Sequence, residues 1–426
     1  MSAVAATLPL RYQTREVGEL GALMAPPYDV IAPAEASELR ARHEHNVVRL
    51  ILPQGEGDER YRRAASTLQS WIDSGVLVKE DRPVVYAHRH AFKAAGVEHQ
   101  RTGLWALLRL SPFAARVVLP HEMTMGGPRA DRLALMRACR AQLSPIFVIS
   151  SDPDGGLSET FQSLTARAAD EHAEFPAGQR HEIWRIEEGA ALDELGRRFE
   201  DRTFLIADGH HRYETALNYR RELVSHGAPE TGDAGHEFVL AHIVPENDPG
   251  LLLQATHRVI MGGRLDWPGA IARLRGRFAI ERLEETELAD EIGGLDRESQ
   301  RSTFILITRD EPKAWRLRLA LDEGGPEPDI AAVALHELLL AEGIGLSLDE
   351  QLPRTEYLRD SQEAMARVRS GEAEAAAILA APRVSEVRKA AEAGRRLPAK
   401  TTFFWPKVPV GIAIHPVDPG VRVRLL

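Results

Sequence analysis

Length, composition and charge exclude several classes of protein. The chain has 426 residues, 44% hydrophobic and 27% charged, which is long enough for two or more globular domains. Its 63 acidic and 53 basic residues give a net charge of −10, which argues against a surface that coats nucleic acid. The single cysteine, Cys139, excludes a disulfide framework and a cysteine-based zinc cluster. Without a signal peptide or membrane-spanning segment in the sequence, we expect a cytoplasmic protein with no membrane partner.

Helix-period and strand-period segments alternate along the chain and predict a mixed α/β (α+β) fold. The predicted strands are residues 47–52, 84–88, 104–110, 146–150, 182–186, 203–207, 238–244, 252–259, 303–308, 375–379 and 401–404. The predicted helices are residues 33–43, 58–74, 129–142, 158–172, 190–199, 211–225, 269–277, 329–341, 361–370 and 385–393. We expect three modules, residues 1–150, 151–265 and 266–426, of which the middle one carries the main site.

The most informative segment is Asp208-Gly209-His210-His211-Arg212, which follows the predicted strand 203–207 and begins a helix. Glycine lets the backbone approach a ligand, the first N–H groups of a helix attract anions, and the basic side chains add charge. Gly209, His210, His211 and Arg212 are therefore predicted to bind phosphate. Asp208 can act as a base, bind Mg²⁺, or simply cap the helix. Zinc is less favoured, because no third ligand stands at a diagnostic spacing.

A second candidate is Pro120-His121-Glu122, which follows the apolar residues 117–119 and precedes a glycine-rich break. Loops at strand ends often hold catalytic groups, and a carboxylate there can take the proton of a substrate hydroxyl. Glu122 is thus a candidate catalytic base, and His121 a candidate substrate-binding residue. The alternative is a solvated glutamate beside a hydrogen-bonded histidine.

Several basic and hydroxyl side chains stand beside apolar runs and are predicted to complete the pocket around a donor or substrate. Lysine is a compact charge suited to phosphate oxygens, whereas the planar guanidinium of arginine binds oxyanions through two parallel hydrogen bonds. The candidates are Arg49, His257, Arg258, Lys400, Thr401 and Lys407. The alternative for the lysines is solubility at the ends of a surface strand, and for the arginines an ion pair with a nearby acid.

The familiar nucleotide and hydrolase motifs are absent. The sequence has no Gly-x-x-x-x-Gly-Lys-Ser/Thr loop, no Gly-x-Gly-x-x-Gly after a strand, no His-Glu-x-x-His and no Gly-x-Ser-x-Gly. A phosphate site must be built in another way.

An ordered set of motifs along the chain resembles the bacterial family catalogued as domain of unknown function 1015. The motifs are Ala-Pro-Pro-Tyr-Asp-Val-Ile at 25–31, Pro-His-Glu at 120–122, Asp-Arg-Leu-Ala-Leu at 131–135, Ser-Pro-Ile-Phe at 144–147, Ala-Asp-Gly-His-His-Arg-Tyr-Glu-Thr-Ala at 207–216, Thr-His-Arg at 256–258 and Lys-Thr-Thr-Phe-Phe-Trp-Pro-Lys at 400–407. The Asp-Gly-His-His-Arg box also resembles the phosphate-binding box of the free serine kinases, which belong to the ParB/sulfiredoxin-like superfamily.

This second resemblance implies a ParB/sulfiredoxin-like phosphate-binding core with additional α/β modules. It implies a kinase that phosphorylates the hydroxyl of free L-serine, with pyrophosphate, ADP or ATP as donor and Mg²⁺ as cofactor. On that interpretation Asp208, Glu122 and His210 are the catalytic candidates and Asp208 the metal ligand. The alternatives are a phosphohydrolase or nuclease that uses the same anion site, and a nucleotide-binding switch without catalysis. The donor, the true acceptor and the oligomeric state are not readable from the sequence.

Overall fold

The structure is a computed structural model that describes residues 2–122, 126–295, 302–310, 314–320 and 330–426. It confirms the mixed α/β class. The chain divides into two compact units, the first comprising Met1–Pro120, Thr124–Leu252 and Pro406–Leu426, and the second His121–Met123 and Leu253–Trp405. This differs from the three modules 1–150, 151–265 and 266–426, because strands on both sides of residue 150 pair in one sheet.

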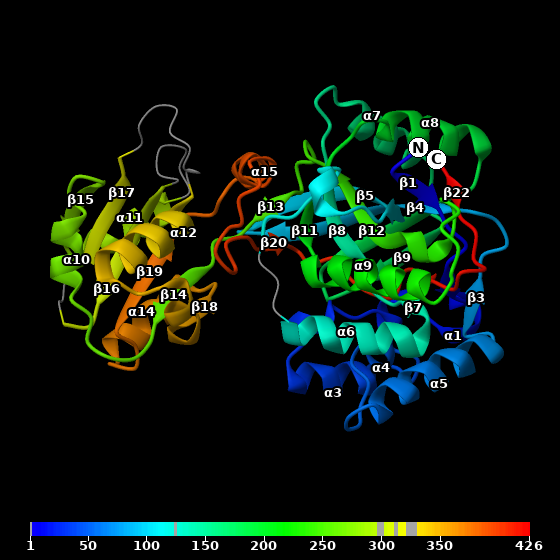
Figure 1. The fold of residues 1–426 in the computed structure, drawn as a ribbon, viewed down its shortest axis with the longest axis horizontal. Helices are drawn as coiled ribbons and strands as arrows, with labels where there is room; N and C mark the ends of the chain where they lie inside the picture. The colour runs from blue at the N-terminus through cyan, green and yellow to red at the C-terminus, as the bar shows by residue number, and fades with distance from the viewer. Residues whose placement is uncertain (1, 123–125, 296–301, 311–313, 321–329) are drawn as a thin grey trace. The chain divides into compact units, whose positions relative to one another are not determined.

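The first unit is built on a sheet with the strand order β6-β11-β8-β12-β5-β4-β10-β9 (Figure 1). The pairs β6–β11 and β8–β12 are parallel, and the other pairs in this order are antiparallel. The strands are β4 (Val85–Ala94), β5 (Val97–Arg109), β6 (Val118–Leu119), β8 (Ile146–Ser150), β9 (Glu171–Glu174), β10 (Arg180–Ile186), β11 (Phe204–Asp208) and β12 (Phe238–Pro245), with β1 (Val4–Ala6) and β22 (Arg424–Leu425) paired beside them.

The two faces of this sheet differ in chemistry because successive side chains of a strand point to opposite faces. One face carries apolar residues such as Ala87, Leu104 and Ile243, which pack against helices α7 (Gly156–Leu164), α8 (Gly189–Phe199) and α9 (His210–Ser225). The other face carries buried polar side chains, including His88 on β4 and His242 on β12.

The predicted strand 47–52 is wrong: these residues form the short helix α4 (Val48–Ile51). A short run of apolar residues buried on all sides does not distinguish strand from helix by periodicity. Here the Asn46 side chain accepts a hydrogen bond from the Val48 N–H and donates to the carbonyl oxygens of Ala22 and Met24. These bonds fix the turn from which α4 begins.

The other predicted helices of the first unit are present, but two of them end earlier than predicted. Helix α6 ends earlier than predicted, because Ala141–Gln142 form strand β7, and the predicted helix 158–172 ends at Leu164 before β9. The other elements are α1 (Thr14–Val17), α2 (Leu20–Leu23), η1 (Tyr28–Val30), α3 (Pro33–Arg42), α5 (Glu59–Asp73), η2 (Phe113–Ala115), α6 (Gly126–Cys139), η3 (Gly235–Glu237), β2 (Leu10–Tyr12), β3 (Leu77–Lys79) and β21 (His415–Pro416).

The second unit has an antiparallel six-stranded sheet with the order β15-β17-β16-β19-β14-β18. Its strands are β14 (His257–Ile260), β15 (Phe278–Leu283), β16 (Thr303–Thr308), β17 (Ala314–Leu319), β18 (Thr355–Leu358) and β19 (Ala375–Leu379). Its helices are α10 (Trp267–Arg273), α11 (Leu288–Gly294), α12 (Ala331–Val333), the π-helix η5 (Ala334–Ile344), α13 (Leu348–Gln351), η6 (Leu352–Arg354), α14 (Ser361–Arg369) and α15 (Val384–Glu392). The core between the sheet and α14 includes Val259, Ile305, Met365 and Ile378.

Three predictions need correction in this unit. The predicted strand 252–259 is interrupted, because only β13 (Leu252–Leu253) and the start of β14 are extended. In the predicted strand 401–404 only Phe404 is in a strand, β20 (Phe404–Trp405). The predicted helix 329–341 is described from residue 330 onward, since Asp329 lies outside the described residues, and it is π-helical from Ala334.

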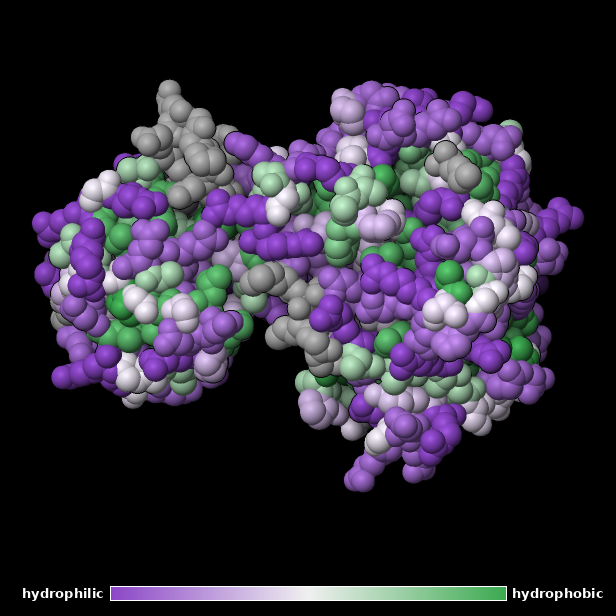
Figure 2. Space-filling model, viewed as in Figure 1, coloured by the Kyte–Doolittle hydropathy of each residue, from purple (hydrophilic) through white to green (hydrophobic). Residues whose placement is uncertain are grey.

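Hydrophilic residues predominate on the face of the first unit shown in Figure 2, and apolar residues appear there in small groups. In the described parts of the chain, no single helix is long and apolar enough to cross a membrane. The segments Ala331–Ile344 and Leu348–Arg354, which are bent by 105°, meet that criterion only together.

Candidate functional site

The predicted phosphate box lies where strand β11 passes into helix α9. Asp208 is the last residue of β11, and Gly209 is the N-cap of α9 with φ of +92°. This left-handed conformation favours glycine. A Cβ atom at position 209 would lie 3.0 Å from Ile146 Cγ2 and 3.1 Å from Arg212 Cζ, so the packing also selects glycine.

The Asp208 carboxylate is bonded to two cations. Its Oδ1 accepts a hydrogen bond from Lys407 Nζ, and its Oδ2 accepts one from Arg212 Nη2, which belongs to the first turn of α9. The three side chains are only 11–15% exposed. Burial by itself would raise the pKa of Asp208, but the charges of Lys407 and Arg212 hold it well below its usual value. Asp208 is therefore ionised at neutral pH.

The N-cap residue of α9 is Gly209, which has no side chain, and the described bonds of the Asp208 carboxylate go to Lys407 and Arg212. The role of Asp208 as a base, metal ligand or helix cap remains a prediction. His210 is the first residue of α9 and is buried. The first N–H groups of any helix have no acceptor within the helix, so this end of α9 is suited to an anion.

Asp208, Arg212 and Lys407 are together called the Asp208 centre. Arg212 also connects this centre to neighbouring motifs. Its Nη1 donates to the carbonyl oxygen of Pro145, and its side chain lines a small cavity of about 40 Å³ with Tyr28, Arg132 and Ser144. The Arg132 guanidinium lies 4.0 Å from the centre of the Tyr28 ring. The motifs at 25–31, 131–135, 144–147 and 207–216 thus meet around Arg212.

Glu122 and its neighbours form a separate cluster within the second unit. Glu122 Oε1 accepts a hydrogen bond of 3.0 Å from the Lys400 N–H, and residue 122 forms a parallel bridge with Leu397. His121 Nε2 lies 2.8 Å from Thr402 Oγ1. The Lys400 side chain is exposed, and Thr401 Oγ1 donates to the Pro398 carbonyl oxygen.

Arg258 and His257 lie on β14 of the same unit. Arg258 is 1% exposed and donates to the carbonyl oxygens of Thr256 and Ala399, and its guanidinium lies 5.2 Å from the Tyr357 ring centre. Burial lowers the pKa of Arg258 to about 10. His257 Nδ1 accepts the N–H of Leu379. These contacts give both side chains structural roles in the unit.

Among the basic residues predicted for the pocket, the structure brings only Lys407 to Asp208 by a described bond. Arg49 lies on α4 in place of an edge strand, and its Nη2 donates to the Arg40 carbonyl oxygen. The roles of Arg49, His257 and Arg258 in substrate binding remain predictions.

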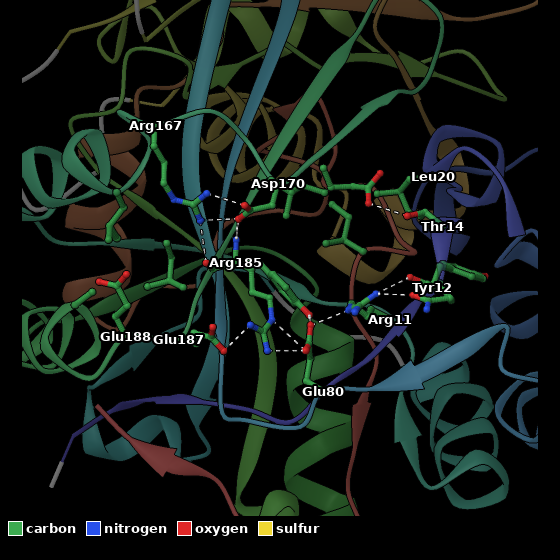
Figure 3. A pocket seen from close by; sticks show the side chains of 18 of the residues that line it. Arg11, Tyr12, Thr14, Leu20, Glu80, Arg167, Asp170, Arg185, Glu187 and Glu188 are labelled. Carbon is green, nitrogen blue, oxygen red and sulfur yellow. Dashed lines mark hydrogen bonds and ion pairs between the residues drawn. The ribbon is translucent and has the colours of Figure 1, made fainter. Parts of the chain in front are cut away.

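A cavity of about 1050 Å³ lies elsewhere in the first unit (Figure 3). Several of its charged side chains form ion pairs: Glu80 with Arg11 and Arg185, and Arg167 with Asp170. None of the residues predicted for the site lines it. Its lining holds five acidic and four basic side chains, so it offers less to a phosphate than the Asp208 centre.

The described residues contain no group of three His, Cys, Asp or Glu side chains arranged to hold a metal ion. The two oxygens of Asp208 already contact cations. Mg²⁺ in phosphate chemistry is often bound by one carboxylate together with substrate oxygens. Magnesium bound to Asp208 thus remains a prediction.

Sequence analysis missed the buried polar residues on the second face of the first sheet. They are His88, His90, Arg101, Trp105, His181 and His242. On β4 the residues His88 and His90 stand two positions apart and share a face, but β12 is apolar apart from His242, so the local sequence gives no clear signal for a polar face.

Comparison with known proteins gives a family and several similar folds. The model of the family described as "Protein of unknown function (DUF1015)" matches residues 5–334. None of the curated proteins matches the chain. A conserved hypothetical protein from Pyrococcus furiosus is similar over 73% of this chain and 95% of its own, with 17% identity and a TM-score of 0.35. A free serine kinase in complex with AMP is similar over 74% and 92%, with 14% identity and a TM-score of 0.38. SbnI from Staphylococcus aureus is similar over 73% and 87%, with 10% identity and a TM-score of 0.39.

Proposed function

The chain belongs to the family of proteins of unknown function called DUF1015, and from its Asp208 centre we propose that it is a phosphotransferase acting on the hydroxyl of a small molecule. One observation carries the proposal. A buried carboxylate is held by Lys407 and Arg212 at the start of helix α9.

The charge balance of this centre suits a phosphate. Two cations face one carboxylate, so the three side chains have a net charge of +1 before the helix and His210 are considered. Helix N-termini and cations stabilise the spread negative charge of a phosphoryl group in transfer. The glycine at position 209 lets Ile146 and the Arg212 guanidinium pack closely against the start of the helix.

Asp208 would orient the acceptor hydroxyl. A carboxylate with a lowered pKa is a weak base, but phosphoryl transfer has a loose transition state and depends mainly on positioning and charge. In the step, the hydroxyl oxygen forms a bond to phosphorus while the bond from phosphorus to the leaving oxygen breaks. The hydroxyl proton passes late to Asp208 and then to water.

We propose L-serine as acceptor, with pyrophosphate, ADP or ATP as donor. The support is the resemblance of residues 208–212 to the phosphate box of the free serine kinases. Mg²⁺ would enter with the donor and supply positive charge at its phosphate oxygens. Glu122 remains a candidate base on the sequence argument alone.

The test is to incubate the purified protein with L-serine, Mg²⁺ and each donor in turn, and to detect O-phosphoserine by mass spectrometry. We expect product with at least one donor, and a fall in rate of about 100-fold or more in Asp208→Asn and Lys407→Met. Lys93→Met is the matched control, because Lys93 is an exposed lysine paired with Glu98 in the same unit. Release of phosphate without phosphoserine would contradict transfer and indicate hydrolysis.

A further inference from the structure

A cluster of buried polar side chains lies on one face of the first unit's sheet. Many of its polar atoms have no hydrogen-bond partner among the described residues. They are Arg101 Nε, Nη1 and Nη2, His90 Nδ1, His242 Nδ1 and Trp105 Nε1. Buried polar groups in proteins are almost always bonded, so such a concentration indicates a missing partner.

Three histidines of the cluster form a directional chain. The Phe175 carbonyl oxygen can only accept, so His181 Nε2 donates to it across 2.6 Å. His181 Nδ1 then accepts from His88 Nε2 at 2.9 Å, and His88 Nδ1 accepts from His242 Nε2 at 3.1 Å. Burial lowers the pKa of all three histidines, which keeps them neutral. This chain of hydrogen bonds therefore ends at His242 Nδ1, an acceptor that receives no hydrogen bond from the described residues.

Arg101 is the buried cation of the cluster. It is 1% exposed, and its guanidinium lies 4.8 Å from the centre of the Phe147 ring. Burial lowers the pKa of Arg101 to about 10, so it is still charged at neutral pH. The carboxylate whose charge acts on it, Asp248, instead accepts the N–H groups of Thr102 and Gly250 at 2.9 and 2.8 Å. A buried charge without a bonded partner is costly in the ligand-free protein.

The cluster is next to the Asp208 centre in the sheet. Phe147 pairs with Asp208 across β8 and β11, where the register of the two strands shifts by one residue, and with His242 across β8 and β12. Directly paired residues share a face of a sheet, and neighbouring strands are about 4.8 Å apart. Arg101 is stacked on Phe147, the residue of β8 that pairs with Asp208.

We propose that Arg101 is a substrate-binding residue that holds the carboxylate of the acceptor beside the Asp208 centre. The inference rests on the proposed function and narrows its acceptor to a hydroxy acid or amino acid. The planar fork of arginine matches a carboxylate with two parallel hydrogen bonds, whereas Lys407 and Arg212 serve the phosphate. An α-ammonium group would find its acceptor at His242 Nδ1.

Two other partners for Arg101 are buried water and a phosphate of the donor. The test separates them by measuring the shift in melting temperature that L-serine, L-serinamide and pyrophosphate produce. The proteins are the wild type, Arg101→Met and Arg109→Met. Arg109 is a matched control because it lies on the same strand and also stacks at 4.8 Å on a phenylalanine, but donates to the Ser2 and Gly232 carbonyl oxygens.

We expect L-serine to raise the melting temperature of the wild type and Arg109→Met but not of Arg101→Met. Pyrophosphate should stabilise all three proteins, and L-serinamide, which lacks the carboxylate, none of them. Without ligand, Arg101→Met should melt no lower than the wild type, since it removes an unpaired buried charge. Arg101→Lys, which keeps the charge but loses the fork, should respond to L-serine at concentrations at least tenfold higher.

Three results would overturn the inference. An unchanged response of Arg101→Met to L-serine would assign the guanidinium to buried water. Loss of the pyrophosphate response alone would assign it to the donor. A much lower melting temperature of unliganded Arg101→Met would make it structural. The proposed function fails separately: an Arg101-dependent response to serine without phosphoserine formation would refute the kinase and keep the inference.

Discussion

The Asp208 carboxylate is paired with two cations, Lys407 and Arg212, so the site has one positive charge in excess. Removing one cation leaves the other to compensate the carboxylate, whereas removing the carboxylate leaves two buried cations facing each other. Breaking a buried ion pair costs about 3–5 kcal/mol when an uncompensated charge remains. Asp208 should therefore matter more to stability than either cation, in addition to its role in transfer.

The lowered pKa of Asp208 predicts a pH dependence of stability. A carboxyl group whose pKa is lower in the folded state stabilises the fold above its unfolded pKa of about 3.9, and this contribution is lost as the pH falls through the folded pKa. Asp208→Asn should thus be destabilised by about 3 kcal/mol at pH 7, and the difference from the wild type should shrink below about pH 4. Urea unfolding at pH 7 and pH 3 measures it. A difference that does not change with pH would refute the coupling.

At the scale of elements, the junction of β11 and α9 is the part of the site that sequence predicts best. The strand, the glycine and the helix all lie within one or two residues of the expected positions, because the signals for them are local. The prediction of a strand at 47–52 was wrong, because an apolar run that is buried on all sides shows no hydrophobic periodicity that distinguishes a strand from a helix. The polar face of the sheet depends on pairing between distant strands, which no local pattern gives.

Helix α9 provides a matched pair of glycines for testing this junction. Gly209 and Gly227 flank the two ends of the helix and both have φ of +92°, but a Cβ at Gly227 would meet no atom within 4 Å. Gly227→Ala should cost about 1 kcal/mol, from backbone strain alone. Gly209→Ala adds contacts with Ile146 and Arg212 and should cost about 2–3 kcal/mol and weaken pyrophosphate binding. Chemical denaturation measures both costs, and equal values would contradict the packing argument.

At the scale of the molecule, sequence places the candidate residues but not the units to which they belong. Lys407 lies 199 residues from Asp208 and still bonds to it, because the C-terminal segment returns to the first unit. Lys400, only seven residues earlier, belongs to the second unit with Glu122. Neither the composition nor the local hydrophobic periodicity of the sequence predicts that the C-terminal segment returns to the first unit.

Because each unit has a core of its own, we predict two unfolding transitions in calorimetry. Ile243→Ala in β12 and Ile305→Ala in β16 each remove a fully buried side chain, at a cost of about 2–5 kcal/mol. Each substitution should lower the melting temperature of one transition by several degrees and leave the other unchanged. A single transition that both substitutions shift equally would show that the two cores unfold together.

The central claim is that the start of α9 binds phosphate through Arg212 and Lys407. Calorimetric titration of pyrophosphate into the wild type, Arg212→Met and Arg137→Met tests it most directly. Arg137 is the matched control, an exposed arginine on α6 that pairs with Glu222. A charge-assisted hydrogen bond contributes about 1.5–3 kcal/mol, so Kd should rise at least tenfold in Arg212→Met and stay unchanged in Arg137→Met. An unchanged Kd in Arg212→Met would contradict the claim.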